Sequence, residues 1–497
     1  MSLARLISRG QAGLTAFEVT VEVHLAGGLP SFAITGLPTA AVRESRDRVR
    51  AALHTSGLPV PPSKITAHLG PADVRKDGGR FDLAIALGVV KADKKFRWKV
   101  DDIEFIGELA LGGELRPVTG ALPAVLAARA ARRRVILPAG NTDEAALVED
   151  AEVYRASHLK EVIEFLHGNS RLQRIEPRKP PRTRLRAADL SDVRGHAAAK
   201  RALTIAAAGG HNLLMVGPPG SGKSMLAERL RGLIPPLDWE DALGVASIAS
   251  VAGDRSALAN GIDPPFRAPH HTTSAQALVG GGTRPRPGEV SLAHRGVLFL
   301  DELPEFSRTA LEALREPMES GVVRISRVRE QISFPAEFQL VAAMNPCPCG
   351  YLGDGTDRCR CSLTRLQQYQ GRVSGPLLDR FDLHIEVPQV SFAELASDSG
   401  RSESAELGDR IAEARERQLA RDGCLNADLE DSAIWRAVPL DRDGLSLLKQ
   451  AVSKWQLSAR GTVRVLRTAR TIADLAGSEK PEIGHLAEAL QLSLIHI

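Results

Sequence analysis

The sequence is poor in aromatic residues and cysteines, and it has no long hydrophobic run. Phe, Trp and Tyr make up 4% of the 497 residues, so the cores must be built from Ala, Leu, Val and Ile. No apolar stretch reaches the roughly 20 residues that a membrane-spanning helix needs. The first residues also lack the apolar core and cleavage site of a signal peptide. We therefore expect a globular protein of the cytoplasm.

A strong net charge is missing too. The chain has 64 Lys and Arg against 60 Asp and Glu, which gives a formal charge of +4. This small excess permits nucleic-acid binding but does not argue for it. Four of the five cysteines lie within 347–361, a spacing that indicates a metal site rather than a disulfide framework.

One segment fits the pattern G-x-x-x-x-G-K-[ST] of a phosphate-binding loop. Glycines let the backbone turn tightly, so that successive N–H groups face phosphate oxygens. The apolar run 211–216 predicts a strand before the loop, and 225–230 predicts a helix after it, whose N-terminus favours an anion. The sequence therefore predicts an ATP site at Gly217, Pro218, Pro219, Gly220, Ser221, Gly222, Lys223 and Ser224.

Two further strand ends carry polar groups suited to ATP hydrolysis. Asp301 and Glu302 follow the apolar run 296–300, and Asn345 follows the run 340–344. We expect Asp301 and Ser224 to hold Mg²⁺, Glu302 to activate the attacking water, and Asn345 to contact that water or the γ-phosphate. The competing interpretations are a chance acidic pair and a turn-forming Asn before Pro346.

Cations in the second half of the chain are candidates for contacts with nucleotide. Arg380 follows a short predicted helix and is a candidate arginine finger for a neighbouring subunit. The alternative is an ion pair with Asp379 or Asp382. Arg460, Arg464 and Arg467 share one helix face, and either Arg460 or Arg464 is the candidate lid cation; a solvated basic face is the alternative.

The clustered cysteines form two C-x-C pairs. Cys347, Cys349, Cys359 and Cys361 match the ligand number of a closed tetrahedral Zn²⁺ site, which leaves no position open for catalysis. We expect a structural zinc knuckle. Free or redox-active cysteines are the alternative, because C-x-C is tighter than the usual C-x₂-C.

Hydrophobic periodicity divides the chain into four parts. Residues 1–168 read as one α/β unit, with strands at 17–25, 65–69 and 134–137, helices at 43–55, 80–90 and 121–131, and a hairpin around 105–113. Residues 169–188 read as a basic, Pro-rich linker or a contact to DNA. Residues 189–390 alternate strand and helix, which predicts a parallel sheet covered on both faces. Residues 391–497 read as an all-α region with helices at 403–421, 430–438, 441–456, 460–476 and 481–493.

A two-stranded hairpin is predicted between Asp301 and Asn345. The alternating run 321–334 places Arg327 and Arg329 near its tip, where cations grip DNA phosphates without reading sequence. A solvated tip is the alternative. The neighbouring pair His270 and His271 receives no assignment.

Several runs resemble the ComM/YifB family of magnesium-chelatase-like AAA+ ATPases. They lie at 42–49, 266–273, 278–282, 287–294 and 344–350. The resemblance implies an N-terminal Lon-protease-like (ribosomal S5 domain 2-like) α/β domain, a P-loop AAA+ domain and a helical lid. It also implies a homo-hexameric ring that drives branch migration, in a helicase-like way, on branched or single-stranded DNA during natural transformation or recombination. The backbone near Val193 would then contact adenine, and His196 stands where the family usually has Gln.

The Lon likeness does not extend to a peptidase site. Arg80 stands where the resemblance places a nucleophilic Ser, and 121–123 contains no Lys. We therefore expect a non-proteolytic domain, which weighs against a Lon-type protease. A magnesium chelatase ATPase subunit is the other alternative. The first 168 residues argue against it. The final residues 493–497 also depart from the family.

Overall fold

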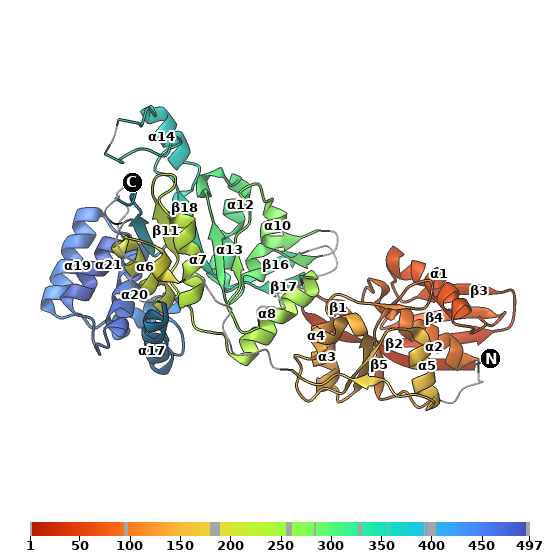
Figure 1. The fold of residues 1–497 in the computed structure, drawn as a ribbon. Coiled ribbons are helices and arrows are strands. Elements are labelled where there is room, and N and C mark those ends of the chain that lie inside the picture. The colour runs from red at the N-terminus through yellow and green to blue at the C-terminus, as the bar shows by residue number, and fades with distance from the viewer. Residues whose placement is uncertain are drawn as a thin grey trace. The chain divides into compact units, whose positions relative to one another are not determined.

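The structure is a computed structural model that describes residues 2–93, 98–178, 189–254, 261–282, 285–326, 331–355, 357–391, 394 and 404–493. The chain forms two compact units (Figure 1). Unit 1 contains Met1–Arg182 and Leu243–Gly261, and unit 2 contains Thr183–Ala242 and Ile262–Ile497. Each unit is described by itself.

Unit 1 is built on an eight-stranded mixed sheet in the order β10-β9-β8-β5-β1-β2-β4-β3. Its centre is the long antiparallel pair β1 and β2, in which Ser2 pairs with Leu25 and Ala12 with Thr15. Alternating buried valines on β2 face the core, as period-two strands require. The strands are β1 (Ser2–Ala12), β2 (Thr15–Ala26), β3 (Ser31–Thr35), β4 (Lys64–Gly70), β5 (Ile103–Phe105), β8 (Arg134–Pro138), β9 (Val153–Ala156) and β10 (Gln173–Arg174), with a separate small hairpin of β6 (Glu108–Leu109) and β7 (Leu115–Arg116).

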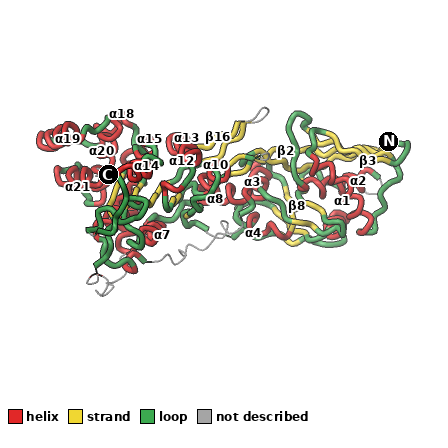
Figure 2. Tube along the Cα trace, turned by 90° about the horizontal axis from the view of Figure 1, so that it is seen from above, coloured by secondary structure: helices red, strands yellow, loops and turns green. Residues whose placement is uncertain are grey.

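Helices cover this sheet. The helix α2 (Asp82–Ala92) is buried along almost its whole length and packs on β1 and β2, while α1 (Ala40–Thr55) packs on α2 (Figure 2). The others are α3 (Ala121–Ala130), α4 (Thr142–Ala145) and α5 (Leu159–His167). The structure has each of the strands, helices and the hairpin expected in this part of the sequence. The strand β1 was not expected, because the buried Ser8 and Arg9 interrupt its apolar pattern.

The helix α8 (Trp239–Ala252) belongs to unit 1 from Leu243 onward, although it lies inside the segment predicted to be the ATPase domain. Ser250 Oγ donates to the Glu144 carboxylate and accepts from the Leu122 N–H at 3.3 Å, and Ala246 joins the hydrophobic cluster around α3. Similarly, β10 lies inside the predicted linker and pairs with β9. The boundaries of the four-part division therefore stay a prediction.

Unit 2 contains a five-stranded parallel sheet in the order β12-β15-β18-β11-β19. The strands are β11 (Leu213–Val216), β12 (Phe266–Arg267), β15 (Val297–Leu300), β18 (Gln339–Met344) and β19 (Leu383–Glu386). The continuous apolar runs of β15 and β18 are fully buried, as expected for a parallel sheet covered on both faces. The predicted α/β fold with a parallel central sheet is confirmed.

Short helices and ribbons surround this sheet. They are α6 (Ala197–Gly209), α7 (Lys223–Leu233), α10 (Ala275–Val279), α11 (Glu289–Leu292), α12 (Arg308–Ala313), α13 (Arg315–Ser320), α14 (Leu363–Gln370) and α15 (Gly375–Leu378), with the ribbons β13 (Gly280–Gly281) with β14 (Arg286–Pro287) and β16 (Val322–Ser326) with β17 (Gln331–Pro335). In the last ribbon Ser326 pairs with Gln331, which confirms the expected hairpin (Figure 2).

The C-terminal part of unit 2 is helical, as predicted, and appears in blue in Figure 1. Its helices are α17 (Ser404–Asp422), α18 (Asp431–Ala437), α19 (Arg442–Trp455), α20 (Ala459–Leu475) and α21 (Ile483–Ser493). Their packing buries Asp474, which accepts from Arg421 at 2.8 Å, Arg470 at 2.8 Å and Asn426 at 2.8 Å. Buried charges need such partners. None of the helices in the described ranges has the length and hydrophobicity needed to cross a bilayer.

Candidate active site

Three neighbouring strand ends bring the predicted catalytic residues together. In the parallel sheet β18 lies between β11 and β15, so the segments that follow these strands leave the sheet at one edge. The phosphate loop follows β11, Asp301 follows β15, and Asn345 follows β18. Ligands of open parallel sheets bind at this carboxyl edge. Residues up to 128 positions apart in sequence therefore share one site.

The phosphate loop is fixed against the sheet by close backbone packing. The Gly217 N–H donates to the Met344 carbonyl at 3.2 Å, and a Cβ at Gly217 would lie 2.1 Å from the Val387 carbonyl oxygen. Gly220 and Gly222 have φ of +74° and +87°, in the left-handed region that favours glycine. These positions require glycine for backbone reasons alone.

The Lys223 ammonium occupies the centre of the loop. Its Nζ donates to the carbonyls of Gly217 at 2.7 Å and Pro218 at 2.9 Å, and to Asn345 Oδ1 at 3.3 Å. Burial lowers the pKa of Lys223, and the neighbouring Asp301 opposes this shift. The ammonium thus has oxygen partners within the chain at 2.7 to 3.3 Å, positions that phosphate oxygens can take over.

Ser224 and Asp301 meet across two strand ends. Ser224 Oγ donates to Asp301 Oδ2 at 2.6 Å, while Asp301 Oδ1 accepts the Glu302 N–H at 2.9 Å. A hydroxyl beside a carboxylate offers the hard oxygen ligands that Mg²⁺ prefers. Their contact supports the expected pairing of these two residues at one cation.

Glu302 has a partner that the sequence did not indicate. Its Oε2 lies 3.0 Å from His271 Nδ1, and the His271 ring lies 4.1 Å from the ring of His270. Glu302 itself has a φ of +53°, an uncommon left-handed conformation for a non-glycine residue. His271 and Glu302 are 31 positions apart in the sequence, and no local pattern links the two histidines to an acidic strand end.

The segment expected at the adenine side lies against the phosphate loop. Val193 is buried and its N–H donates to the Leu190 carbonyl at 3.1 Å. His196 Nε2 lies 3.9 Å from the position that a Cβ of Gly222 would take. Burial lowers the pKa of His196, and a hydrogen bond with the Ser221 backbone opposes the shift. His196 is therefore packed on the loop.

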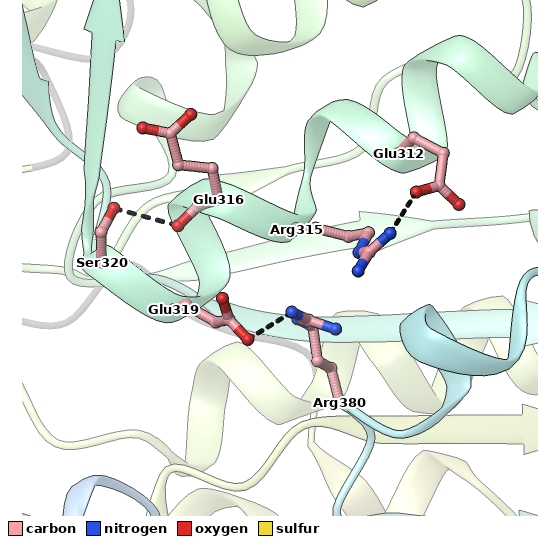
Figure 3. Close-up of a pocket in the computed structure, with 6 residues that line it drawn as sticks. All are labelled: Glu312, Arg315, Glu316, Glu319, Ser320 and Arg380. Atoms are coloured by element: carbon pink, nitrogen blue, oxygen red, sulfur yellow. Dashed lines mark hydrogen bonds and ion pairs between the residues drawn. The ribbon is translucent and has the colours of Figure 1, made fainter.

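Arg380 lies in a small pocket of charged side chains (Figure 3). Its guanidinium forms an ion pair with Glu319 from the end of α13, rather than with Asp379 or Asp382. Arg460 Nη2 also reaches Glu319 Oε1, at 3.3 Å. The predicted arginine finger and one of the two candidate lid cations thus share a single carboxylate.

Arg464 differs from Arg460 in its surroundings. Its side chain is 12% exposed, whereas that of Arg460 is 60% exposed. Arg464 donates to the Phe381 carbonyl and lies 3.7 Å from Asp379, and burial lowers its pKa. Of the two candidates, Arg464 is thus the buried residue and Arg460 the accessible one. Arg467 on the same helix pairs with Asp431 at 3.0 Å.

The four clustered cysteines converge after β18. Their sulfurs all lie within 4.8 Å of one another, and Cys347 is buried. The Tyr351 N–H and the Cys347 thiol lower the pKa of Cys349 to about 6. The loop between the two C-x-C pairs thus folds back, as expected. Cys424 is not part of this cluster.

The two expected DNA-contacting cations, Arg327 and Arg329, lie outside the described residues, which end at Ser326 and resume at Gln331. Arg80, at the place of a Lon nucleophile, is buried in unit 1 and donates to the Thr119 carbonyl.

Three family models match the chain. The one described as magnesium chelatase, subunit ChlI, matches residues 189–395. Those described as subunit ChlI of Mg-chelatase and as magnesium chelatase, subunit ChlI C-terminal, match residues 21–141 and 401–493.

Curated relatives match over the full length. The chain is 47% identical over 496 residues to competence protein ComM of Haemophilus influenzae, covering 99% of this chain and 97% of the relative. It is 45% identical to YifB of Escherichia coli, covering 100% and 98%. It is 25% identical over 299 residues to the magnesium-chelatase 38 kDa subunit of Rhodobacter capsulatus, covering 57% and 79%. The chain belongs to the ComM/YifB family of magnesium-chelatase-like AAA+ proteins.

Proposed function

We propose that the chain is an ATPase that assembles into a homo-hexameric ring and uses ATP hydrolysis to move DNA. The observation that carries the ATPase part is that Lys223 contacts Asn345 and Ser224 contacts Asp301, so that residues from three strand ends meet. A phosphate loop, a magnesium-binding hydroxyl and an acidic strand end are the parts that P-loop ATPases share. Kinship to a protein named for competence supports the DNA part.

Each residue has a role in this proposal. Lys223 exchanges its carbonyl partners for the terminal phosphates, and the loop N–H groups hold the remaining phosphate oxygens. Ser224 and Asp301 hold Mg²⁺, which supplies charge neutralisation on the phosphates when bound. Glu302 accepts a proton from the attacking water, and Asn345 orients that water.

The second half of the site comes from a neighbouring protomer in this proposal. Arg380 leaves Glu319 and approaches the neighbour's γ-phosphate, where a guanidinium stabilises transition-state charge. Arg460, bound to the same carboxylate, is the better candidate for the lid cation because it is exposed. Arg464 is enclosed and holds the Phe381 carbonyl, which favours a structural role.

We assign DNA contact to the hairpin of β16 and β17, whose strands lead directly to Arg327 and Arg329. Cations there contact the backbone, so binding depends on salt and not on sequence. The N-terminal domain serves as a scaffold in this proposal. Arg80 in this domain is buried and donates to a backbone carbonyl. A guanidinium in this position does not supply a nucleophile.

The test is ATP hydrolysis by the full chain with and without a branched DNA junction and single-stranded DNA at low salt. We expect stimulation by DNA. The double variant Arg327→Ala/Arg329→Ala should keep basal hydrolysis and lose DNA affinity, with a salt dependence shallower by about one unit of slope per lost contact. The control Arg410→Ala/Arg417→Ala removes two exposed charges from α17 and should match the unsubstituted chain. ATP hydrolysis that no DNA changes would refute the DNA part.

The second candidate is the ATPase subunit of a magnesium chelatase. The descriptions of the family models that match residues 189–395 and 21–141 favour it by name, whereas the magnesium-chelatase 38 kDa subunit matches only 57% of this chain. ATP-dependent insertion of Mg²⁺ into a porphyrin, in the presence of chelatase partner subunits, would decide for this candidate.

A further inference from the structure

We propose that Cys347, Cys349, Cys359 and Cys361 bind one structural Zn²⁺ ion, and that this metal site holds Asn345 and the phosphate loop in place. The first part stands on the cysteine cluster alone. The second part rests on the proposed ATP site.

The sulfur positions fit a single metal ion. A tetrahedral Zn²⁺ with bonds of about 2.3 Å separates its sulfur ligands by about 3.8 Å. Cys347 Sγ lies 3.3 Å from Cys349 Sγ and 3.9 Å from Cys359 Sγ, and all four sulfurs lie within 4.8 Å. These separations are too long for a disulfide, whose S–S bond is about 2.05 Å. Sulfur–sulfur separations in this range fit four ligands of one shared ion.

The sulfurs are only partly exposed to solvent. Cys347 is buried, and Cys349, Cys359 and Cys361 are half-buried. Four soft thiolates without an open position favour Zn²⁺ in a structural role.

The intervening loop is held in shape by its own contacts. Asp354 pairs with Arg358 at 2.7 Å, and the Arg358 guanidinium lies 4.4 Å from the centre of the Tyr351 ring. The Gly350 N–H donates to the Cys347 carbonyl at 3.0 Å, which closes a turn. A preorganised loop loses little conformational entropy when it binds an ion.

The cluster touches the ATP site through two connections. Asn345, which accepts from Lys223, lies two residues before Cys347. Gly350 has a φ of +87°, and a Cβ there would lie 2.4 Å from Pro219 Cδ and 3.8 Å from Asn345 Cγ. The turn between the first C-x-C pair and the loop therefore packs directly on the phosphate loop. A metal ion that fixes this turn also fixes Asn345 and Pro219.

The first experiment measures metal in the full chain, purified without chelators, by elemental analysis. We expect about one zinc per chain. The double variant Cys359→Ser/Cys361→Ser should lose it, and the control Cys424→Ser should keep it. Cobalt added to the chelator-treated chain should give the absorption of tetrahedral thiolate ligation. A chain that binds neither zinc nor cobalt after reduction, or that holds iron instead, overturns the assignment.

The second experiment measures nucleotide binding and turnover before and after zinc removal with a chelator, and again after zinc is returned. We expect kcat to fall about tenfold to a hundredfold on removal, the range that small displacements of catalytic groups produce, and to recover on return. Circular dichroism shows whether the chain stays folded. Unchanged binding and turnover in the zinc-free chain overturn the link to the ATP site. A zinc-loaded chain that binds no ATP refutes the proposed function but leaves the metal site in place.

Discussion

The two halves of the proposed ATP site differ in what their charged groups contact within one chain. Lys223, Ser224 and Asp301 contact one another or the loop's own carbonyls, at strand ends fixed by the parallel sheet. Arg380 and Arg460 instead share Glu319 on α13. The groups of the first half are therefore already in contact within one chain, whereas the arginines of the second half are neutralised by a carboxylate. In the proposed function, one protomer thus supplies the binding pocket and its neighbour supplies the catalytic arginine.

The largest expected effect comes from Arg380→Ala. An arginine finger contributes about 10³- to 10⁵-fold to turnover, so hydrolysis should nearly vanish while ATP binding stays intact. Lys223→Ala should lose binding as well, because its ammonium contacts phosphate directly. Steady-state hydrolysis and binding of a fluorescent ATP analogue measure the two quantities.

Mixing the two inactive variants tests shared catalysis directly. In a mixed ring, the intact ATP pocket of an Arg380→Ala chain can lie next to the intact Arg380 of a Lys223→Ala chain. ATP hydrolysis should therefore return in part. Arg417→Ala, which removes an exposed arginine paired with Glu413 at 3.2 Å, is the control. Full activity of Arg380→Ala alone would contradict the comparison.

Acid pH should lower the stability of unit 2, which contains both halves of the proposed site. Burial lowers the pKa of His294 to about 4 from 6.5, and the Glu337 N–H donates to its unprotonated Nδ1 at 3.1 Å. The unfolded chain binds a proton below pH 6.5 and the folded chain does not, so stability is full above pH 6.5. It should fall by about 3 kcal/mol as the pH drops to 4.

Urea unfolding at a series of pH values measures this loss. The variant His294→Asn keeps an acceptor for the Glu337 N–H but does not titrate, and it should show a smaller change between pH 6.5 and 4. An equal pH dependence in both chains would exclude His294 as the cause.

Glu319→Gln should release both cations from their shared carboxylate. A partly buried ion pair of this kind contributes about 1 kcal/mol, so ATP-dependent assembly should occur at about fivefold lower protein concentration. Light scattering against chain concentration measures the midpoint. Glu413→Gln, which breaks an exposed pair on α17, should leave the midpoint unchanged. Weaker assembly in Glu319→Gln would mean that Glu319 itself belongs to the interface.

The smallest effect is expected for His271→Ala. His271 Nδ1 lies within hydrogen-bond distance of the Glu302 carboxylate at the surface, and exposed polar contacts contribute up to about 1 kcal/mol. Basal hydrolysis should rise by at most about fivefold when Glu302 is free to reach water. His271→Gln retains a hydrogen-bond donor and should stay near the original rate. Lower hydrolysis in His271→Ala would instead show that His271 assists Glu302.

Local sequence patterns were sufficient to predict a feature where all the residues that identify it lie in one strand, helix or loop. The phosphate loop, the acidic end of β15 and the helices of the C-terminal region follow from residue types at fixed spacing. The strand β1 was not predicted because it contains Arg9, which is buried and whose Nη2 lies 2.6 Å from Glu104 Oε1. In the sequence alone, a charged residue of this kind is taken for a surface residue, because its buried partner is not visible. The packing of α8 on unit 1 was not predicted for another reason. The sequence of an apolar helix does not show which hydrophobic core the helix packs against.

The sequence alone was enough to identify the family, the residues of the proposed ATP pocket and the two C-x-C pairs of the proposed zinc site, because each depends on residues that stand close together in the chain. Only the tertiary structure decided that His271 pairs with Glu302, that Arg380 and Arg460 share Glu319, and that the turn at Gly350 packs on Pro219. These contacts join segments up to 141 residues apart. Their partners are selected by the order of strands in the sheet, which no local pattern encodes.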